Sequence, residues 1–241
     1  LPGRNCVHFQ RMEELVRKAV DQAGQEVMIF PTMWSPFKIA SFTYVFGGSS
    51  DEKFMQHCKE DPDSVLAGVQ AIADTLEDWA EGFLEAGADG LYYSVQFSEP
   101  GRFTEEEWDK LVKSFDLQIL NRVHCHEEKY NIVHICGEAE HNFTASPQRY
   151  KDYPGDLFNW DVHRDNFTLE QGREYFGKPV LGGLDNHGIL IEGSLEDIAG
   201  ETHRIIKGFG KKGLMIGADC TVPADIDINR LRAAVMAARE V

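Results

Sequence analysis

The sequence predicts an α/β protein folded as a (β/α)8 TIM barrel, and three observations support this prediction. Short apolar runs typical of buried strands alternate with amphipathic segments typical of helices along the whole chain. No glycine-rich phosphate-binding loop follows any expected strand, which removes the main sign of a nucleotide-binding open sheet. Polar residues gather where the expected strands end, and barrels build their active sites at that end of the strands.

Six strands are expected, each short, rich in apolar or β-branched residues, and bounded by Gly, Pro or Asp. They cover residues 26–30, 90–95, 130–135, 157–161, 179–184 and 213–217. A complete barrel has eight strands. We therefore expect residues 1–241 to form a single barrel domain that lacks its N-terminal strands.

The expected helices lie between these strands and carry recognisable ends. In residues 104–115, Thr104 precedes Glu107 by three positions, which is the capping box that begins a helix. Three further amphipathic segments are expected to be helical, namely residues 61–87, residues 194–210 and a last helix from about Asn229.

Composition limits the class of protein. The chain has 241 residues, 42% of them hydrophobic, which is enough for one large core. Its 24 basic and 40 acidic residues give a net charge of -16, which argues against a nucleic-acid partner. There is no apolar run long enough for a membrane span and no signal-peptide pattern. The five scattered cysteines favour a reducing cytoplasm over a disulfide framework.

A candidate metal site begins with His134 and Cys136. Their spacing of two residues places both side chains on the same face of a strand. Imidazole nitrogen and thiolate sulfur are the usual protein ligands of zinc. The pair alone is weak evidence, because a cysteine and a histidine at the end of a strand are commonly part of the core.

Cys220 strengthens this hypothesis, because it also follows an expected strand, three strands further along the chain. The ends of separated strands converge over one mouth of a barrel. Two sulfurs and one nitrogen leave a fourth position open, as in catalytic zinc sites. The alternative is that Cys220 is a small buried residue before a turn.

Other polar residues are weaker candidates. Asp161 and Asp185 lie at strand ends, where they could act in catalysis by orienting a substrate or a ligand, or could cap helices and loops. Glu138 and His141 follow Cys136, but we expect their side chains to be solvated. Four residues are expected to contact the substrate, although Tyr93 could equally belong to the core: Tyr93, Gln96, Asn159 and His187.

From Gln25 to Glu240 the chain resembles the uroporphyrinogen decarboxylase superfamily, whose fold is a (β/α)8 barrel. The matching segments occur in family order and include "FLEAGADGLYYS", "IVHICGE", "DLFNWDVH", "KPVLGGLDNHGILIEGSLEDI" and "LMIGADCTVPADIDINRLRAAVMAAR". The resemblance implies an enzyme. The tetrapyrrole decarboxylases of this superfamily have an arginine-rich signature near the N-terminus, and that signature is not seen in this sequence.

Within this superfamily, His134, Cys136 and Cys220 match the ligand pattern of the zinc-dependent methyltransferases that act with methyl-corrinoid proteins. That branch implies protein-bound Zn²⁺, a corrinoid (methylcobalamin) carried by a partner protein, and methyl transfer to or from a small thiol or a methoxylated or methylated compound. Asp161 lies roughly where related methionine synthases have an acidic ligand, although the family residue there is a glutamate. Two alternatives remain open, a metal-free tetrapyrrole decarboxylase and a non-catalytic metal-binding barrel.

Overall fold

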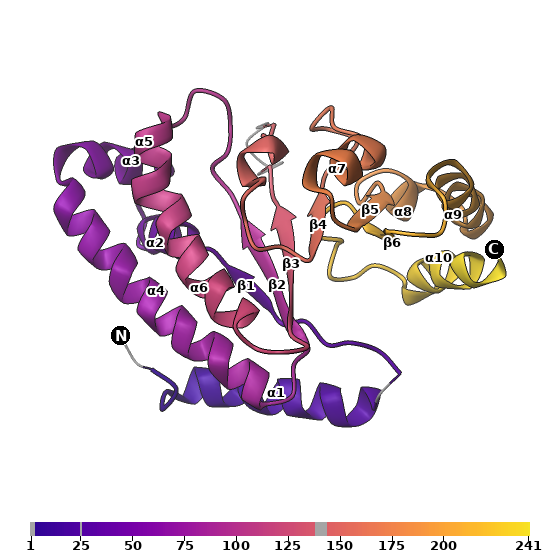
Figure 1. The fold of residues 1–241 in the computed structure, drawn as a ribbon, viewed down its shortest axis with the longest axis horizontal. Helices are drawn as coiled ribbons and strands as arrows, with labels where there is room; N and C mark the ends of the chain where they lie inside the picture. Colours follow the sequence, from indigo (N-terminus) through magenta and orange to yellow (C-terminus); the bar gives the residue numbers. More distant parts are fainter. Residues whose placement is uncertain (1–2, 25, 138–143) are drawn as a thin grey trace. The chain divides into compact units, whose positions relative to one another are not determined.

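The computed structural model describes residues 3–24, 26–137 and 144–241 (Figure 1). The protein has an α/β fold with a six-stranded parallel sheet in the order β1-β2-β3-β4-β5-β6. The α/β prediction is therefore confirmed. Strand order follows chain order, as in a barrel, whereas a doubly wound sheet reverses direction at a switch point. The sheet is thus consistent with part of a TIM barrel.

Five of the six predicted strands lie within one residue of their expected bounds. The strands are β1 (Thr32–Trp34), β2 (Gly90–Val95), β3 (Tyr130–Ile135), β4 (Leu157–Trp160), β5 (Val180–Leu184) and β6 (Leu214–Ala218). Their register is parallel, with Thr32 opposite Tyr92 in one pair and Val180 opposite Leu214 in another.

The prediction of a strand over residues 26–30 is wrong. Val27 and Met28 are 58% and 49% exposed, so this apolar run does not enter the core. The Ile29 N–H donates to Oδ2 of Asp89 at 2.7 Å, and the Ile29 carbonyl accepts from the Asp89 N–H at 2.9 Å. These contacts hold the segment beside the loop before β2, and the strand itself begins only after Pro31, which has no N–H to donate.

The chain divides into two compact units within β3. The first comprises the residues up to Gln96, Gly101–Ile132 and Tyr153–Gly155; the second comprises Phe97–Pro100, Val133–Asp152 and Asp156–Val241. The prediction of a single barrel domain stays a prediction.

In the first unit, helices pack beside β1 and β2. They are α1 (Val7–Ala23), α2 (Pro36–Phe46), α3 (Asp51–Glu60), α4 (Pro62–Glu85), α5 (Glu105–Trp108) and α6 (Ser114–His124), with a π-helical turn at Asp109–Lys113. The predicted capping box is confirmed, because Thr104 accepts from the Glu107 N–H and Glu107 accepts from the Thr104 N–H. Helices α4 and α6 run side by side (Figure 1).

In the second unit, helices also pack beside the strands. These are α7 (Leu169–Phe176), α8 (Ile189–Glu192), α9 (Leu195–Phe209) and α10 (Ile228–Glu240), with a 3-10 turn at Pro147–Tyr150. The Phe158 and Phe176 rings stack with centroids 4.0 Å apart beside the buried Trp160. An apolar cavity of about 430 Å³ lies between β6, α9 and α10, and none of the candidate metal ligands lines it.

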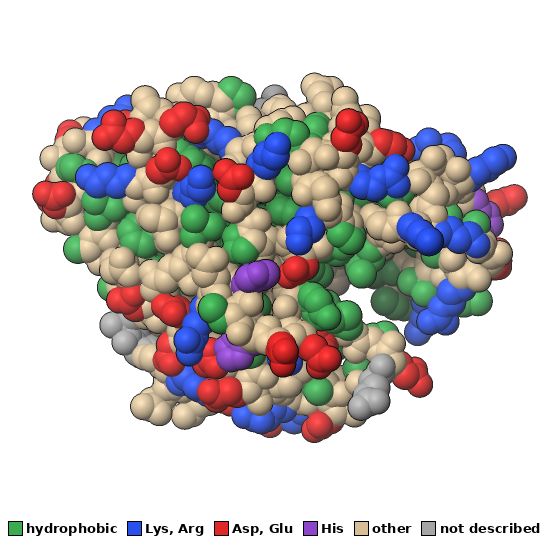
Figure 2. Space-filling model, viewed as in Figure 1, with side chains coloured by type: hydrophobic (Ala, Val, Ile, Leu, Met, Phe, Trp, Pro, Cys, Tyr) green, Lys and Arg blue, Asp and Glu red, His purple; other side chains and the backbone are tan. Residues whose placement is uncertain are grey.

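Acidic and basic side chains are interspersed on the face of the molecule in Figure 2. Within the described part of the chain, no helix has both the length and the apolar character that crossing a membrane requires.

Candidate metal centre

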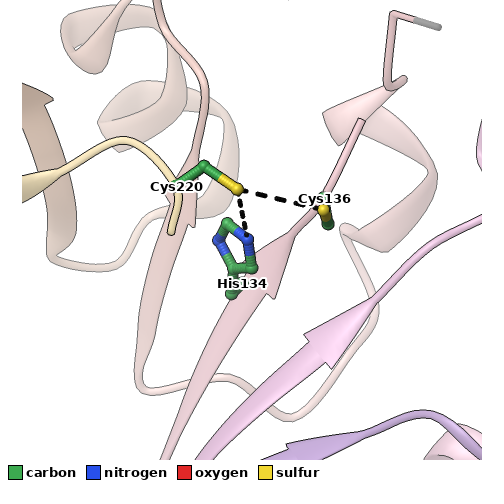
Figure 3. A group of neighbouring side chains, drawn as sticks. All are labelled: His134, Cys136 and Cys220. Atoms are coloured by element: carbon green, nitrogen blue, oxygen red, sulfur yellow. Dashed lines mark hydrogen bonds between the residues drawn. The ribbon is translucent and has the colours of Figure 1, made fainter. Parts of the chain in front are cut away.

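The ends of β3 and β6 bring the three predicted metal ligands together (Figure 3). Sγ of Cys220 lies 4.0 Å from Sγ of Cys136 and 3.5 Å from Nε2 of His134. His134 is only 4% exposed, and the two cysteines are partly buried. Residues separated by more than 80 positions thus converge on one point, as the sequence predicts from parallel strands.

These separations fit a tetrahedral zinc ion. Zinc–sulfur bonds of about 2.3 Å and zinc–nitrogen bonds of about 2.0 to 2.1 Å at tetrahedral angles place two sulfurs about 3.8 Å apart. The same geometry places sulfur and nitrogen about 3.6 Å apart. The sulfurs are also too far apart for a disulfide, whose S–S bond is about 2.05 Å, and both cysteines are free. The donor set therefore fits the metal that the sequence predicts.

The surroundings of Cys220 favour its thiolate form. The neighbouring Cys136 thiol, through its hydrogen bond, lowers the pKa of the Cys220 thiol well below its ordinary value, and His134 adds to this effect. Burial alone would raise the pKa of a thiol, so the two contacts outweigh desolvation here. The thiolate is the form of cysteine that binds metals.

Asn159 fixes the tautomer of His134. Its Nδ2 donates to the carbonyls of Leu181 and Ala218 at 2.9 and 3.2 Å, which orients the amide. Its Oδ1 then faces Nδ1 of His134 at 2.5 Å and must accept a hydrogen bond from the Nδ1–H group. Nε2 of His134 is thereby left with a lone pair on the side of Cys220. The structure places Asn159 behind a candidate metal ligand, and its expected contact with the substrate stays a prediction.

Asp219 anchors the loop that carries Cys220. Its Oδ1 accepts from the Gly183 N–H at 2.6 Å, and its Oδ2 accepts from the Val162 N–H at 3.1 Å. Gly182 permits this approach, because its φ is +141° and an added Cβ would lie 3.0 Å from the Asp219 carboxylate. The ends of β4, β5 and β6 are therefore joined through one buried side chain, which sequence reasoning placed at a strand end without giving it a role.

Asp161, His163 and Asp219 form a second group whose ligand atoms lie close together. Nδ1 of His163 lies 2.7 Å from Oδ2 of Asp219, and this contact raises the pKa of His163. Burial, together with the nearby Asp219 carboxylate, raises the pKa of Asp161. Oδ1 of Asp161 accepts from the N–H groups of His163 and Arg164, both at 3.1 Å, so this residue also shapes the turn after β4.

The remaining predicted residues of the second unit lie after β5. Oδ1 of Asp185 accepts from the N–H groups of His187 and Gly188, both at 2.9 Å, which closes the turn before α8. The His187 side chain is exposed, yet it lines the same small cavity as Cys136 and Cys220. Asp185 does not line this cavity, so of Asp185 and His187 only His187 borders the same space as the candidate metal ligands.

Tyr93 and Gln96 belong to the first unit and are fully or nearly fully buried. The Tyr93 hydroxyl donates to Oδ1 of Asp116 at 2.9 Å, and the Tyr153 hydroxyl donates to Oδ2 of the same carboxyl group. Gln96 donates to the Ser94 hydroxyl at 2.6 Å. Tyr93 therefore has the core position that the sequence left open, and a role of either residue in substrate binding stays a prediction.

The cavity beside the three ligands has room for about 20 Å³ and is lined by several polar groups, which include Asp161, Arg164 and His187. Asp165 also lines this cavity, and its buried carboxyl group was not identified by sequence reasoning. Its only sequence signal is its place four residues after Asp161 in a strand-end turn. Glu138 and His141 lie outside the described residues.

Comparisons with solved structures show the fold of this chain. Over 95% of its length it is similar to a methyltransferase from Methanosarcina mazei, with 18% identity and a TM-score of 0.75. It is also similar to a B12-independent methionine synthase from a Shewanella species, with 14% identity and a TM-score of 0.62 over 95% of its length. The chain spans 63% and 65% of the lengths of these two proteins.

No curated protein matches the chain. The sequence profile of the family described as uroporphyrinogen decarboxylase (URO-D) matches residues 5–241, nearly the whole chain. The chain therefore belongs to the uroporphyrinogen decarboxylase family.

Proposed function

We propose that this protein transfers a methyl group with the help of a zinc ion held by His134, Cys136 and Cys220. The observation that carries the proposal is the convergence of these three donors at separations that fit tetrahedral zinc. Similarity to a methyltransferase and to a methionine synthase adds support, because both act on methyl groups by name. The family match supports an assignment of this protein to the enzymes of the superfamily.

The residues of the centre have separate tasks. Cys136, Cys220 and Nε2 of His134 would hold the ion and leave a fourth position open toward the small cavity. Zinc held in this way supplies Lewis acidity that lowers the pKa of a bound thiol or polarises a methoxy oxygen. Asn159 orients the imidazole. We assign substrate contacts in the cavity to Asp161 and His187, and the positioning of the loop before α8 to Asp185.

We further propose that the methyl group is exchanged with a corrinoid carried by a separate protein, as the resemblance implies. In the direction toward a thiol, the corrinoid would supply the methyl group and retain the electron pair of its bond to carbon, and the thiolate sulfur of the substrate would form the new bond to carbon. Docking of a corrinoid protein requires an open mouth at the carboxyl ends of the strands. We infer that the six strands form part of a (β/α)8 barrel, which would provide that mouth. The free cysteines support a reducing compartment such as the cytoplasm.

Decarboxylation of a tetrapyrrole is a second candidate, because the matching family is described by that activity. A decarboxylase of this kind would need no bound zinc. A non-catalytic metal-binding barrel would bind zinc but transfer no methyl group. The three hypotheses therefore differ in two measurable properties, the zinc content and the methyl-transfer activity of the purified protein.

The test of the proposed activity uses free methylcobalamin as the donor and 2-mercaptoethanol as the acceptor, followed by the visible absorption of the cobalt centre. We expect loss of the methylcobalamin spectrum with the zinc-loaded protein and with a Cys125→Ser control, whose cysteine is exposed and belongs to the other compact unit. The Cys220→Ser variant should lose this activity. The proposal is contradicted if the zinc-loaded protein leaves free methylcobalamin unchanged and also transfers no methyl group when a corrinoid protein is the donor.

A further inference from the structure

Asp165 has one carboxylate oxygen without a partner in the candidate metal centre. The residue is 7% exposed and lies in the turn after β4, where its N–H donates to the Asp161 carbonyl at 2.9 Å. Its Oδ1 accepts from the Ala145 N–H at 2.9 Å. Within the described ranges, its Oδ2 has no hydrogen-bond partner. Leaving a buried acceptor unpaired costs about 1–3 kcal/mol, so such an atom in a folded protein requires an explanation, and a catalytic role is one of those known.

The place where that ligand would lie is defined by the cavity. Asp165 lines the same small space as Cys136 and Cys220, and this space has room for about 20 Å³. A space of that size admits one water-sized group with polar partners. The group that meets Asp165 in this space is therefore small, and both sulfur-bearing residues border the same space.

The other polar groups around this space are less suited to accept a proton. Arg164 is permanently charged and has no acceptor. Oδ1 of Asp161 is engaged by two backbone N–H groups, and His187 is exposed to solvent. Asp219 approaches from the end of β6 with both oxygens bonded, and Nδ1 of His134 is engaged by Asn159.

We propose that Oδ2 of Asp165 accepts the proton of a thiol that enters this cavity, so that the substrate is a thiol rather than a methoxylated compound. The inference rests on the proposed function. The S–H bond breaks, its electron pair stays on sulfur, and an O–H bond forms on Oδ2; the proton returns to solvent after the product leaves. An ether brings no proton for this oxygen to accept.

The electrostatic surroundings support this assignment. Burial, together with the carboxylates of Asp161 and Asp219, raises the pKa of Asp165 to about 7, while the Ala145 N–H and His134 oppose the rise. A proton acceptor works best when its pKa lies near the working pH. Burial and the neighbouring carboxylates thus both favour a proton on Asp165.

The test uses protein loaded with Co²⁺ in place of zinc. The visible absorption of the Co²⁺ ion measures the binding of 2-mercaptoethanol at several pH values between 7.5 and 9. If Asp165 keeps the proton, the apparent affinity of the parent protein changes less than about twofold over this range, since no proton is released. In Asp165→Asn the proton goes to solvent, so the affinity should rise about tenfold per pH unit. At pH 7.5 it should be at least about tenfold weaker than in the parent.

The variant keeps an oxygen for the Ala145 N–H, so we expect it to fold, and thermal unfolding checks this. Asp152→Asn, at an exposed position of the same unit, should behave as the parent does. A tenfold rise per pH unit in the parent itself overturns the inference even if the variant fails to fold. A parent that holds Co²⁺ but binds no thiol overturns the inference and leaves the metal centre standing. A parent that holds no metal overturns the proposed function as well.

Discussion

Oδ1 of Asn159 lies 2.5 Å from Nδ1 of His134, and the Asn159 amide is held in place by the carbonyls of Leu181 and Ala218. One buried amide on β4 thus connects a strand-end histidine of β3 to β5 and β6. Groups that bond the second nitrogen of a metal-binding histidine fix its ring and its tautomer. The candidate centre therefore depends on Asn159, although Asn159 does not line the cavity beside the candidate ligands.

Replacement of Asn159 by Ala should weaken zinc binding by about 10- to 100-fold, because the imidazole loses its orientation. Competition with a chromophoric chelator measures this affinity. The matched control is Asn131→Ala, because Asn131 is also buried and also donates to two carbonyls, those of Leu120 and Pro154. Both variants should lose about 1–3 kcal/mol in the free energy of unfolding. Equal zinc affinities for both variants would show that Asn159 has only a structural role.

Asp116 should make the protein less stable as the pH rises from about 4 to about 7. Burial raises the pKa of this carboxyl group to about 7, although Tyr93 and Tyr153 donate hydrogen bonds to it. The ordinary pKa of an aspartate, about 3.9, applies in the unfolded chain. Between the two values the folded protein holds a proton that the unfolded chain has lost, so the free energy of unfolding falls as pH increases.

Asp116→Asn removes this dependence. The free energy of unfolding of the variant, relative to the parent, should therefore increase by up to about 4 kcal/mol between pH 4 and pH 8. Urea unfolding at several pH values measures the difference, and Asp63→Asn, at an exposed position of α4, is the control. A constant difference across this range would contradict the prediction.

Gly172 of α7 should not tolerate a side chain. A Cβ there would lie 2.0 Å from the buried Trp160 ring, whereas a Cβ at Gly200 of α9 would meet nothing within 4 Å. Gly172→Ala should therefore destabilise the protein by about 1–3 kcal/mol through overpacking. Gly200→Ala should stabilise it by about 0.5–1 kcal/mol through helix propensity. Thermal unfolding compares the two, and an equal response would show that Trp160 moves aside without cost.

The approach of the three candidate metal ligands was predictable from strand positions. Residues two apart on β3 share a face, and in a barrel the ends of separated strands converge, so the sequence predicts that Cys220 approaches His134 and Cys136. Asp165 could not be predicted in this way, because its burial depends on how the turn after β4 folds inward. The strand predicted over residues 26–30 failed for a related reason, since an apolar run does not reveal whether it reaches the core.

Tyr93 illustrates another limit of sequence reasoning. A tyrosine near the end of a strand suits a substrate pocket and a core equally well. Its place was decided by Asp116 and Tyr153, which lie 23 and 60 positions away along the chain and provide a buried polar partner. No local pattern indicated that Asp116, on a helix, would be buried with them.

The zinc content of the purified protein tests the central claim most directly. We predict about one zinc per chain in the parent and in the Cys125→Ser control, and loss of most of the metal in Cys220→Ser, because serine is a poor zinc ligand. Elemental analysis after removal of loosely bound metal measures this ratio. Less than about half an equivalent of zinc in the parent, with no further loss in Cys220→Ser, would contradict the account.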